Sequence, residues 1–130
     1  MNKVIALGAD NGYMDKVETT IKSVCVHNDN IKFYVFNDDL PSEWFRVMNK
    51  RLEKINSQIV NAKISDNHLR KYHLPRPHLS YAAYFRFFIP EVVEEERVLY
   101  LDSDIVVDGN LTDLFEIDLG DSPVSYTHLR

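Results

Sequence analysis

Strand-like and helix-like segments alternate along the first half of the chain. Residues 4–9, 31–36 and 58–64 are short runs with strand-forming residues, and each is followed by polar turn residues. Between them, residues 14–27 carry apolar side chains at helical spacing, and a second amphipathic helix is expected to start at residues 41–43. This order of elements predicts an α/β fold with a mainly parallel sheet, in which residues 4–9 form a central strand.

Composition narrows the class of protein. With 130 residues, the chain has room for one domain with a sizeable core. Hydrophobic residues make up 45% and charged residues 27%, as is typical of a soluble globular protein. The net charge of −5 argues against a nucleic-acid partner, because such surfaces need clustered Lys and Arg. No apolar run has spanning length and no signal-peptide core begins the chain, so a soluble, cytoplasmic protein is expected.

The chain contains a single cysteine, Cys25, which excludes an internal disulfide. Cys25 falls on the apolar face of the helix predicted at residues 14–27. This position predicts a small buried hydrophobic side chain rather than a reactive thiol.

The most informative local motif is an apolar run that ends in two closely spaced carboxylates. Residues 98–101 predict a short buried strand, and Asp102, Ser103 and Asp104 follow where that strand leaves the sheet. In open α/β sheets the ligand crevice lies outside the carboxyl ends of the strands, and both carboxylates face it if Ser103 sits at a bend. Two hard oxygen ligands suit Mg²⁺ or Mn²⁺, which complete their shells with water and substrate phosphates. An ordinary turn without a metal is the alternative, since Asp and Ser are common turn residues.

The remaining segments give weaker signals. Residues 65–79 are polar, contain three histidines and predict a loop; a zinc site there is disfavoured because no cysteine accompanies them. Residues 80–88 predict an aromatic helix whose only charge, Arg86, must either extend to solvent or find an anionic partner. Residues 105–107 predict a short strand, and residues 111–115 predict a short helical turn.

Three blocks of sequence, taken together and in this order, resemble glycosyltransferase family 8. They are Ile-Ala-Leu-Gly-Ala-Asp-Asn-Gly-Tyr at 5–13 with Lys-Ser-Val at 22–24, Ser-Tyr-Ala-Ala-Tyr-Phe-Arg at 80–86, and Val-Leu-Tyr-Leu-Asp-Ser-Asp at 98–104 with Leu-Thr-Asp-Leu-Phe at 111–115. The resemblance covers residues 4 to about 121, which correspond to only the first part of the family's catalytic domain. It implies a Rossmann-like GT-A fold with a mainly parallel sheet and flanking helices, incomplete at the C-terminus.

The resemblance also implies a uridine-binding turn after the first strand, formed by Ala9, Asp10 and Tyr13. Asp10 can accept a hydrogen bond from the uracil N3–H, and the Tyr13 ring can lie against the base. Gly12 departs from the family's pattern, in which a polar side chain is common, so that contact is lost or made by the backbone.

On the same basis, Arg86, Asp102, Ser103 and Asp104 are expected to bind the diphosphate and the donor sugar. Asp102 and Asp104 are the expected ligands of Mn²⁺ (or Mg²⁺), which neutralises charge on the leaving diphosphate. Arg86 is expected to reach the donor sugar and the Asp-x-Asp turn, which supplies its anionic partner. Because the carboxyl ends of parallel strands meet at one edge, residues 9–13 and the turn at Ser103 are predicted to converge there. The catalytic residues stay unassigned.

The family implies a retaining hexosyltransferase that moves glucose or galactose from UDP-glucose or UDP-galactose to a glycan, lipopolysaccharide or protein-linked acceptor. The family's distal His-x-x-Gly-x-Lys segment, which supplies a third protein metal ligand, is not found in this chain, so the chain alone is expected to be inactive. A cytoplasmic location is expected, and peripheral association with the inner face of the membrane, through sequence beyond this chain, is the alternative.

The resemblance divides the chain into two parts. Residues 1–122 are interpreted as the N-terminal, nucleotide-sugar-binding part of a glycosyltransferase domain. Residues 123–130 (Pro-Val-Ser-Tyr-Thr-His-Leu-Arg) change character and are interpreted as a non-native, adapter-derived tail, with a genuine loop as the alternative. His128 lies in this tail, so it is not assigned as the missing metal ligand.

Two rival interpretations stay open at the level of sequence. The first is a haloacid dehalogenase-type phosphatase with Asp102 as its nucleophile, since that class also places Asp-x-Asp after an apolar strand. The second is a non-catalytic nucleotide-sugar-binding module. The phosphatase motif usually lies near the start of a chain, and that interpretation leaves Asp10, Tyr13 and Arg86 without a role.

Overall fold

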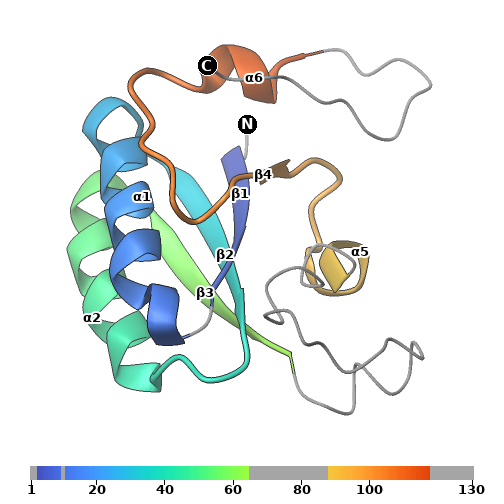
Figure 1. Cartoon of the computed structure of the whole chain (residues 1–130). Coiled ribbons are helices and arrows are strands. Elements are labelled where there is room, and N and C mark those ends of the chain that lie inside the picture. Colours follow the sequence, from blue (N-terminus) through green and yellow to red (C-terminus); the bar gives the residue numbers. More distant parts are fainter. Residues whose placement is uncertain (1–2, 10, 65–87, 118–130) are drawn as a thin grey trace.

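The computed structural model describes residues 3–9, 11–64 and 88–117, which form a sheet with helices packed against it (Figure 1). The elements are β1 (Lys3–Gly8), η1 (Asn11–Tyr13), α1 (Met14–His27), β2 (Ile31–Asn37), α2 (Ser42–Leu52), η2 (Glu53–Ile55), β3 (Gln58–Lys63), α5 (Ile89–Val92), β4 (Leu99–Tyr100) and α6 (Thr112–Phe115). The predicted alternation of strands and helices is therefore confirmed. Within these ranges, no helix has the length and hydropathy to cross a membrane.

The four strands form one sheet in the order β3-β2-β1-β4, and every pairing is parallel. β1 lies inside the sheet, as predicted for a central first strand. It pairs with β2 along its whole length and with β4 through Ile5 and Ala6. Parallel pairing brings the carboxyl ends of β1 and β4 to the same edge of the sheet, which is where α/β proteins of this kind bind ligands.

Helices α1 and α2 cover one face of the sheet (Figure 1). Ile5 and Leu7 of β1 pack in one buried cluster with Val17, Ile21 and Val24 of α1. The three α1 residues are among those whose helical spacing predicted this helix. Burial of each side chain contributes roughly 1.5–3 kcal/mol of hydrophobic stabilisation. The α2 helix contributes its buried residues Phe45, Met48 and Leu52.

The opposite face of the sheet carries a second cluster. The alternate β1 residues, Val4 and Ala6, pack there with Tyr34 of β2. Phe88 and Val93, which flank α5, belong to the same cluster. The α5 helix lies on this side of the sheet (Figure 1). The inner strands β1 and β2 are thus buried on both faces, as is usual for a parallel sheet, whereas half of the residues of β3 are exposed.

Of two strands predicted near the carboxylates, the first is wrong in part and the second is wrong. The strand expected over residues 98–101 contains only Leu99 and Tyr100, and both are partly rather than fully buried, because β4 forms an edge of the sheet among the described residues. The strand expected over residues 105–107 does not form, because its backbone groups bond to side chains of α1 instead of to a strand. The helical turn expected at 111–115 is confirmed as α6.

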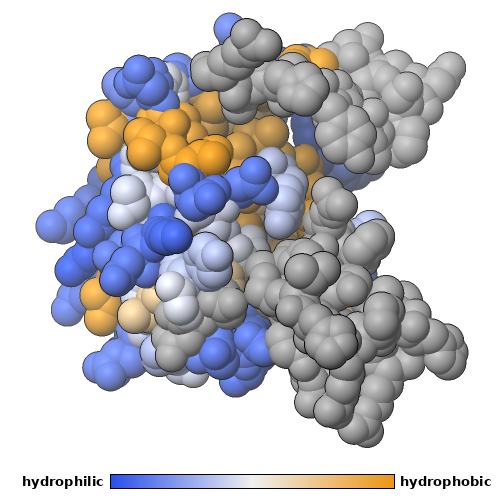
Figure 2. All heavy atoms as spheres, viewed as in Figure 1, coloured by the Kyte–Doolittle hydropathy of each residue, from blue (hydrophilic) through white to orange (hydrophobic). Residues whose placement is uncertain are grey.

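Apolar side chains also reach the surface near the segment that follows the carboxylates. Figure 2 shows hydrophobic residues gathered where the end of α1 meets residues 105–111. Val26 of α1 and Val106 are the most exposed large hydrophobic residues of the described ranges, at 73% and 72%. The other described residues seen on this face are mostly hydrophilic (Figure 2).

Several predictions concern residues outside the described ranges. They are the loop at residues 65–79, the aromatic helix at 80–88 except Phe88, the tail at 123–130, Asp10 and Arg86. These stay predictions.

Candidate functional site

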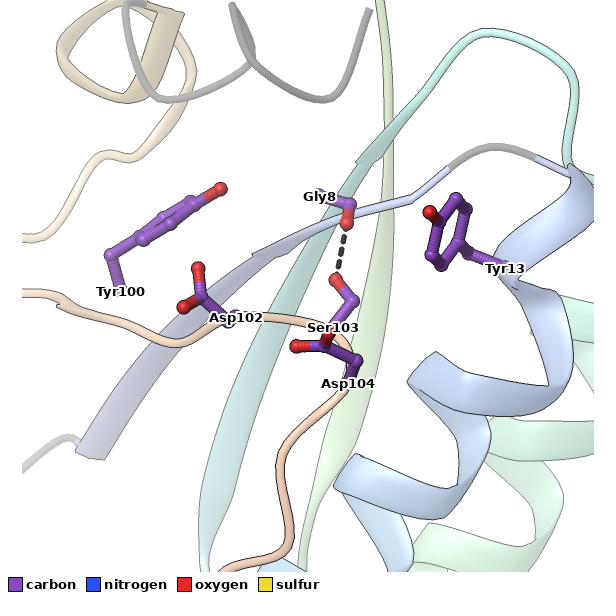
Figure 3. Close-up of a pocket in the computed structure, with 6 residues that line it drawn as sticks. All are labelled: Gly8, Tyr13, Tyr100, Asp102, Ser103 and Asp104. Carbon is purple, nitrogen blue, oxygen red and sulfur yellow. Dashed lines mark hydrogen bonds between the residues drawn. The ribbon is translucent and has the colours of Figure 1, made fainter. Parts of the chain in front are cut away.

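A pocket lies at the carboxyl edge of the sheet, between the ends of β1 and β4 and the start of α1 (Figure 3). Its lining residues are Gly8, Tyr13, Tyr100, Asp102, Ser103 and Asp104. The pocket has a volume of about 250 Å³. Small-molecule sites usually occupy roughly 300–1,000 Å³. The pocket formed by the described residues is therefore smaller than a usual small-molecule site.

Hydrogen bonds place the Asp-Ser-Asp turn beside the end of β1. The N–H of Leu101 donates to the carbonyl oxygen of Ala6 at 3.0 Å, which extends the β4–β1 pairing by one residue. The Ser103 hydroxyl then donates to the carbonyl oxygen of Gly8 (Figure 3). Ser103 lies in a turn, as predicted, and this turn shares the pocket with Tyr13. The predicted convergence of the two loops at one edge of the sheet is confirmed.

The carboxylates of Asp102 and Asp104 both lie in this pocket (Figure 3). Both residues are exposed, and neither forms an ion pair with another residue of the described ranges. Two carboxylates in one pocket favour binding of a cation. Among the described residues no third His, Cys, Asp or Glu completes a metal-binding group, so a metal here keeps positions open for phosphate oxygens and water.

Two aromatic rings flank the carboxylates. Tyr13, the last residue of η1, is 40% exposed, and the centroid of its ring lies 4.7 Å from Lys16 Nζ. Tyr100 lies across the pocket from Tyr13 (Figure 3). Sequence analysis missed Tyr100 and Gly8 as lining residues. The signal for Tyr100 was present, because residues two apart along a strand face the same side and Tyr100 is two before Asp102.

Ala9 is not brought into the pocket. Its side chain is buried in the cluster between β1 and α1, and its N–H donates to the carbonyl oxygen of Phe36 at 2.9 Å. The role predicted for Ala9 in uridine binding can therefore involve only its carbonyl group. Asp10 and Arg86, the other two predicted contacts, lie outside the described residues.

Cys25 is partly buried and packs against the cluster between β1 and α1. Burial raises the pKa of its thiol to about 11, because the low-dielectric surroundings disfavour the thiolate. A neutral thiol is a poor nucleophile, so this finding agrees with the predicted hydrophobic role.

The fold and the site together define a class of protein. A parallel α/β sheet that carries paired carboxylates and an exposed aromatic ring at its carboxyl edge is typical of proteins that bind a nucleotide with a divalent cation. The chain belongs to the family described as Glycosyl transferase family 8, whose model matches residues 4–127. The resemblance found in the sequence is confirmed.

Individual relatives agree with this assignment. Glycosyltransferase GlyB of Streptococcus pneumoniae serotype 4 is 61% identical over 117 residues, which cover 90% of this chain and 29% of GlyB. The apo form of glycosyltransferase GlyE of Streptococcus pneumoniae TIGR4 superposes with a TM-score of 0.80 at 36% identity, covering 93% of this chain and 28% of GlyE. The galactosyltransferase LgtC, solved with donor and acceptor sugar analogs, superposes with a TM-score of 0.69 at 27% identity, covering 91% and 44%.

These comparisons establish the fold and the extent of the match. The structural neighbours are GT-A glycosyltransferases, so the predicted GT-A fold is confirmed. Glycosyltransferases of this fold generally use a divalent metal. The chain spans less than a third of the length of GlyB and of GlyE.

Proposed function

We propose that the complete protein is a retaining hexosyltransferase and that this chain binds the UDP part of its glucose or galactose donor. One observation carries the proposal: the exposed carboxylates of Asp102 and Asp104 share a pocket with the exposed ring of Tyr13 in a member of glycosyltransferase family 8. Such carboxylates suit a cation bound to a diphosphate, and such a ring suits a base. The complex of LgtC with donor and acceptor sugar analogs supports a sugar donor and a glycan acceptor.

The residues present fit Mn²⁺ or Mg²⁺. Asp102 and Asp104 offer hard oxygen ligands, and their exposure leaves room for the phosphate oxygens and water that these ions also require. Zinc is less suited, because it prefers Cys and His ligands and neither type lines the described part of the pocket. When bound, the ion would stabilise the negative charge that develops on the leaving diphosphate.

The remaining side chains of the pocket bind and orient the donor in this proposal. The Tyr13 ring offers its exposed face to the uracil, and Asp10, the third residue before it, accepts the base N3–H. Tyr100 bounds the pocket on the side opposite Tyr13 (Figure 3). Arg86 contacts the donor sugar and balances the charge of the turn. A glycan, lipopolysaccharide or protein-linked acceptor binds through parts of the protein beyond this chain.

Membership in glycosyltransferase family 8 argues against the phosphatase alternative. A phosphatase would use Asp102 as a nucleophile, whereas a glycosyltransferase uses it to hold the metal. The second alternative, a non-catalytic module, would also bind the nucleotide sugar but would not transfer it. Transfer of labelled hexose from a UDP-sugar therefore distinguishes a transferase from both.

The decisive experiment for the site is calorimetry of UDP binding to the complete protein, with Mn²⁺ and with EDTA. We expect Mn²⁺ to tighten UDP binding, because metal and nucleotide share the phosphate oxygens and each must strengthen the other's binding. Asp104→Asn should remove most of this increment and leave the metal-free affinity unchanged. Asp108→Asn is the matched control, since Asp108 is an exposed aspartate in the same segment but outside the pocket. Equal UDP affinity with Mn²⁺ and with EDTA in the unchanged protein would contradict the proposal.

A further inference from the structure

The segment that follows the carboxylates is held against α1 by side chains of the helix. The Thr20 hydroxyl donates to the carbonyl oxygen of Ile105 at 2.7 Å. One helical turn later, the Ser23 hydroxyl accepts a hydrogen bond from the N–H of Val107 at 2.8 Å. Ile105 directly follows Asp104, so the Thr20 bond holds the Ile105–Val106 peptide group, one residue past the second carboxylate. This bonding replaces the strand pairing that the sequence predicted for residues 105–107.

The same support continues past the end of α1. Asn28, the C-cap residue, is buried, and its side-chain amide donates to the carbonyl oxygen of Gly109 at 3.1 Å. The side-chain oxygen of Asn28 accepts the N–H of Leu111 at 2.8 Å. Three polar side chains, those of Thr20, Ser23 and the cap residue Asn28, therefore bond to the backbone of the segment between Ile105 and the start of α6.

Thr20 differs from its neighbour Thr19 in its burial and in the acceptor of its hydroxyl group. The hydroxyl of Thr19 is exposed and donates within α1, to the carbonyl oxygen of Asp15 at 2.9 Å, as helical threonines commonly do. Thr20 is completely buried and donates out of the helix. A buried hydroxyl is costly unless it is bonded, so Thr20 stabilises only the arrangement in which Ile105 lies against α1.

Hydrogen bonds thus hold the backbone of the Asp102–Ser103–Asp104 turn on both sides, while the two carboxylates are exposed to solvent. Before the turn, the N–H of Leu101 bonds to β1; within it, the Ser103 hydroxyl bonds to Gly8; after it, Ile105 bonds to Thr20. Fixing a backbone before a ligand arrives lowers the conformational entropy that binding must remove. The exposed side chains of Asp102 and Asp104 need this support, because no ion pair with a described residue orients them.

We propose that Thr20 is a positioning residue for the cation site: through its hydrogen bond to Ile105 it holds the Asp102–Ser103–Asp104 turn in the geometry that binds the metal–diphosphate group. This inference rests on the proposed function, because it assumes that the carboxylates hold the metal. Ser23 supports the same segment through Val107. Neither side chain lines the described part of the pocket, so both act through the turn and not on the ligand.

The test compares three variants in the complete protein. Thr20→Val keeps the side-chain shape and removes the hydroxyl, Thr20→Ser keeps a hydroxyl, and Thr19→Val is the matched control on the adjacent residue. UDP affinity is measured by calorimetry with Mn²⁺ and with EDTA, and the bound Mn²⁺ is examined by electron paramagnetic resonance. We expect Thr20→Val to reduce the Mn²⁺-dependent increment about threefold to tenfold, the effect of one lost hydrogen bond, and to alter the Mn²⁺ spectrum.

The controls separate positioning from a general loss of structure. UDP affinity in EDTA should be the same in all three variants, Thr20→Ser should recover the Mn²⁺ increment, and Thr19→Val should match the unchanged protein. If Thr20→Val does not fold, Ser23→Ala replaces it and is judged by the same comparison. The inference about Thr20 would be overturned, and the proposed function left standing, if Thr20→Val had the same Mn²⁺-dependent increase in UDP affinity and the same Mn²⁺ spectrum as Thr19→Val. Absence of any Mn²⁺ effect in the unchanged protein would instead overturn the proposed function.

Discussion

At the scale of single residues, the proposed site separates the recognition of the base from that of the diphosphate. Tyr13 is the last residue of η1, whereas Asp102 and Asp104 lie after β4. The ring and the carboxylates therefore belong to different elements and touch different parts of UDP in the proposal. Substitutions in one group should leave the contribution of the other intact, because their effects are carried by separate contacts.

Tyr13→Ala is expected to weaken UDP binding about tenfold, the effect of losing a base-stacking ring. The loss should be the same with Mn²⁺ and with EDTA, since the ring contacts the base and not the metal. Tyr13→Phe keeps the ring and should bind UDP almost as the unchanged protein does. Calorimetry of the complete protein measures all three affinities. A loss that appears only when Mn²⁺ is present would show that Tyr13 acts through the metal site, contrary to its proposed role.

At the scale of the elements, a polar contact fastens the segment that leads into β4. The Tyr34 hydroxyl of β2 donates to Glu95 Oε1 at 2.6 Å, and Lys32 Nζ lies 3.1 Å from Glu95 Oε2. The hydrogen bond from Tyr34 lowers the pKa of Glu95 below its ordinary value, and Lys32 adds to the effect. Burial and the same carboxylate raise the pKa of Tyr34. This contact lies at the amino end of β2, away from the pocket, and its role is to hold the chain before β4 on the sheet.

Glu95→Gln should therefore lower the free energy of unfolding by about 1 kcal/mol at neutral pH, because a charged hydrogen bond becomes a neutral one. The folded state holds Glu95 below its unfolded pKa of 4.5, so this stabilisation is complete above that pH and is lost as the pH falls through the lower folded value. Denaturant unfolding at several pH values measures the difference. Glu94→Gln, an exposed neighbour with the same change of charge, should have little effect. A gap between unchanged and Glu95→Gln protein that persists at the lowest pH would contradict this account.

The elements also show what sequence can and cannot predict. The helix α1 was predictable from the spacing of Val17, Ile21 and Val24, because a helix that buries one face carries apolar residues every three or four positions. The segment at 105–107 was wrongly predicted as a strand, since strand-forming residues do not reveal that their backbone partners are the side chains of Thr20 and Ser23. For the same reason the support of the turn by α1 was missed, although a polar residue on the apolar face of a predicted helix was a visible signal.

At the scale of the whole molecule, the proposed function assigns to the carboxyl edge of the sheet only part of a transferase site. The described residues supply two carboxylates and a pocket of about 250 Å³, and no third metal-binding side chain joins them. The chain spans 29% of GlyB and 28% of GlyE. Binding of the nucleotide should therefore need only this chain, whereas transfer of the sugar should need the complete protein.

We expect residues 1–130 alone to bind UDP with Mn²⁺ but to transfer no hexose, and the complete protein to transfer it. Two carboxylates leave most of the metal's shell to water and phosphate, so the short chain should bind bare Mn²⁺ weakly and depend on UDP to hold it. Transfer also requires an acceptor to be held against the sugar in a site that excludes water, which an open pocket of this size does not provide. Labelled UDP-glucose and UDP-galactose, each offered with and without a glycan acceptor, measure transfer in both proteins. Transfer by residues 1–130 at a rate near that of the complete protein would show that the acceptor side lies within this chain.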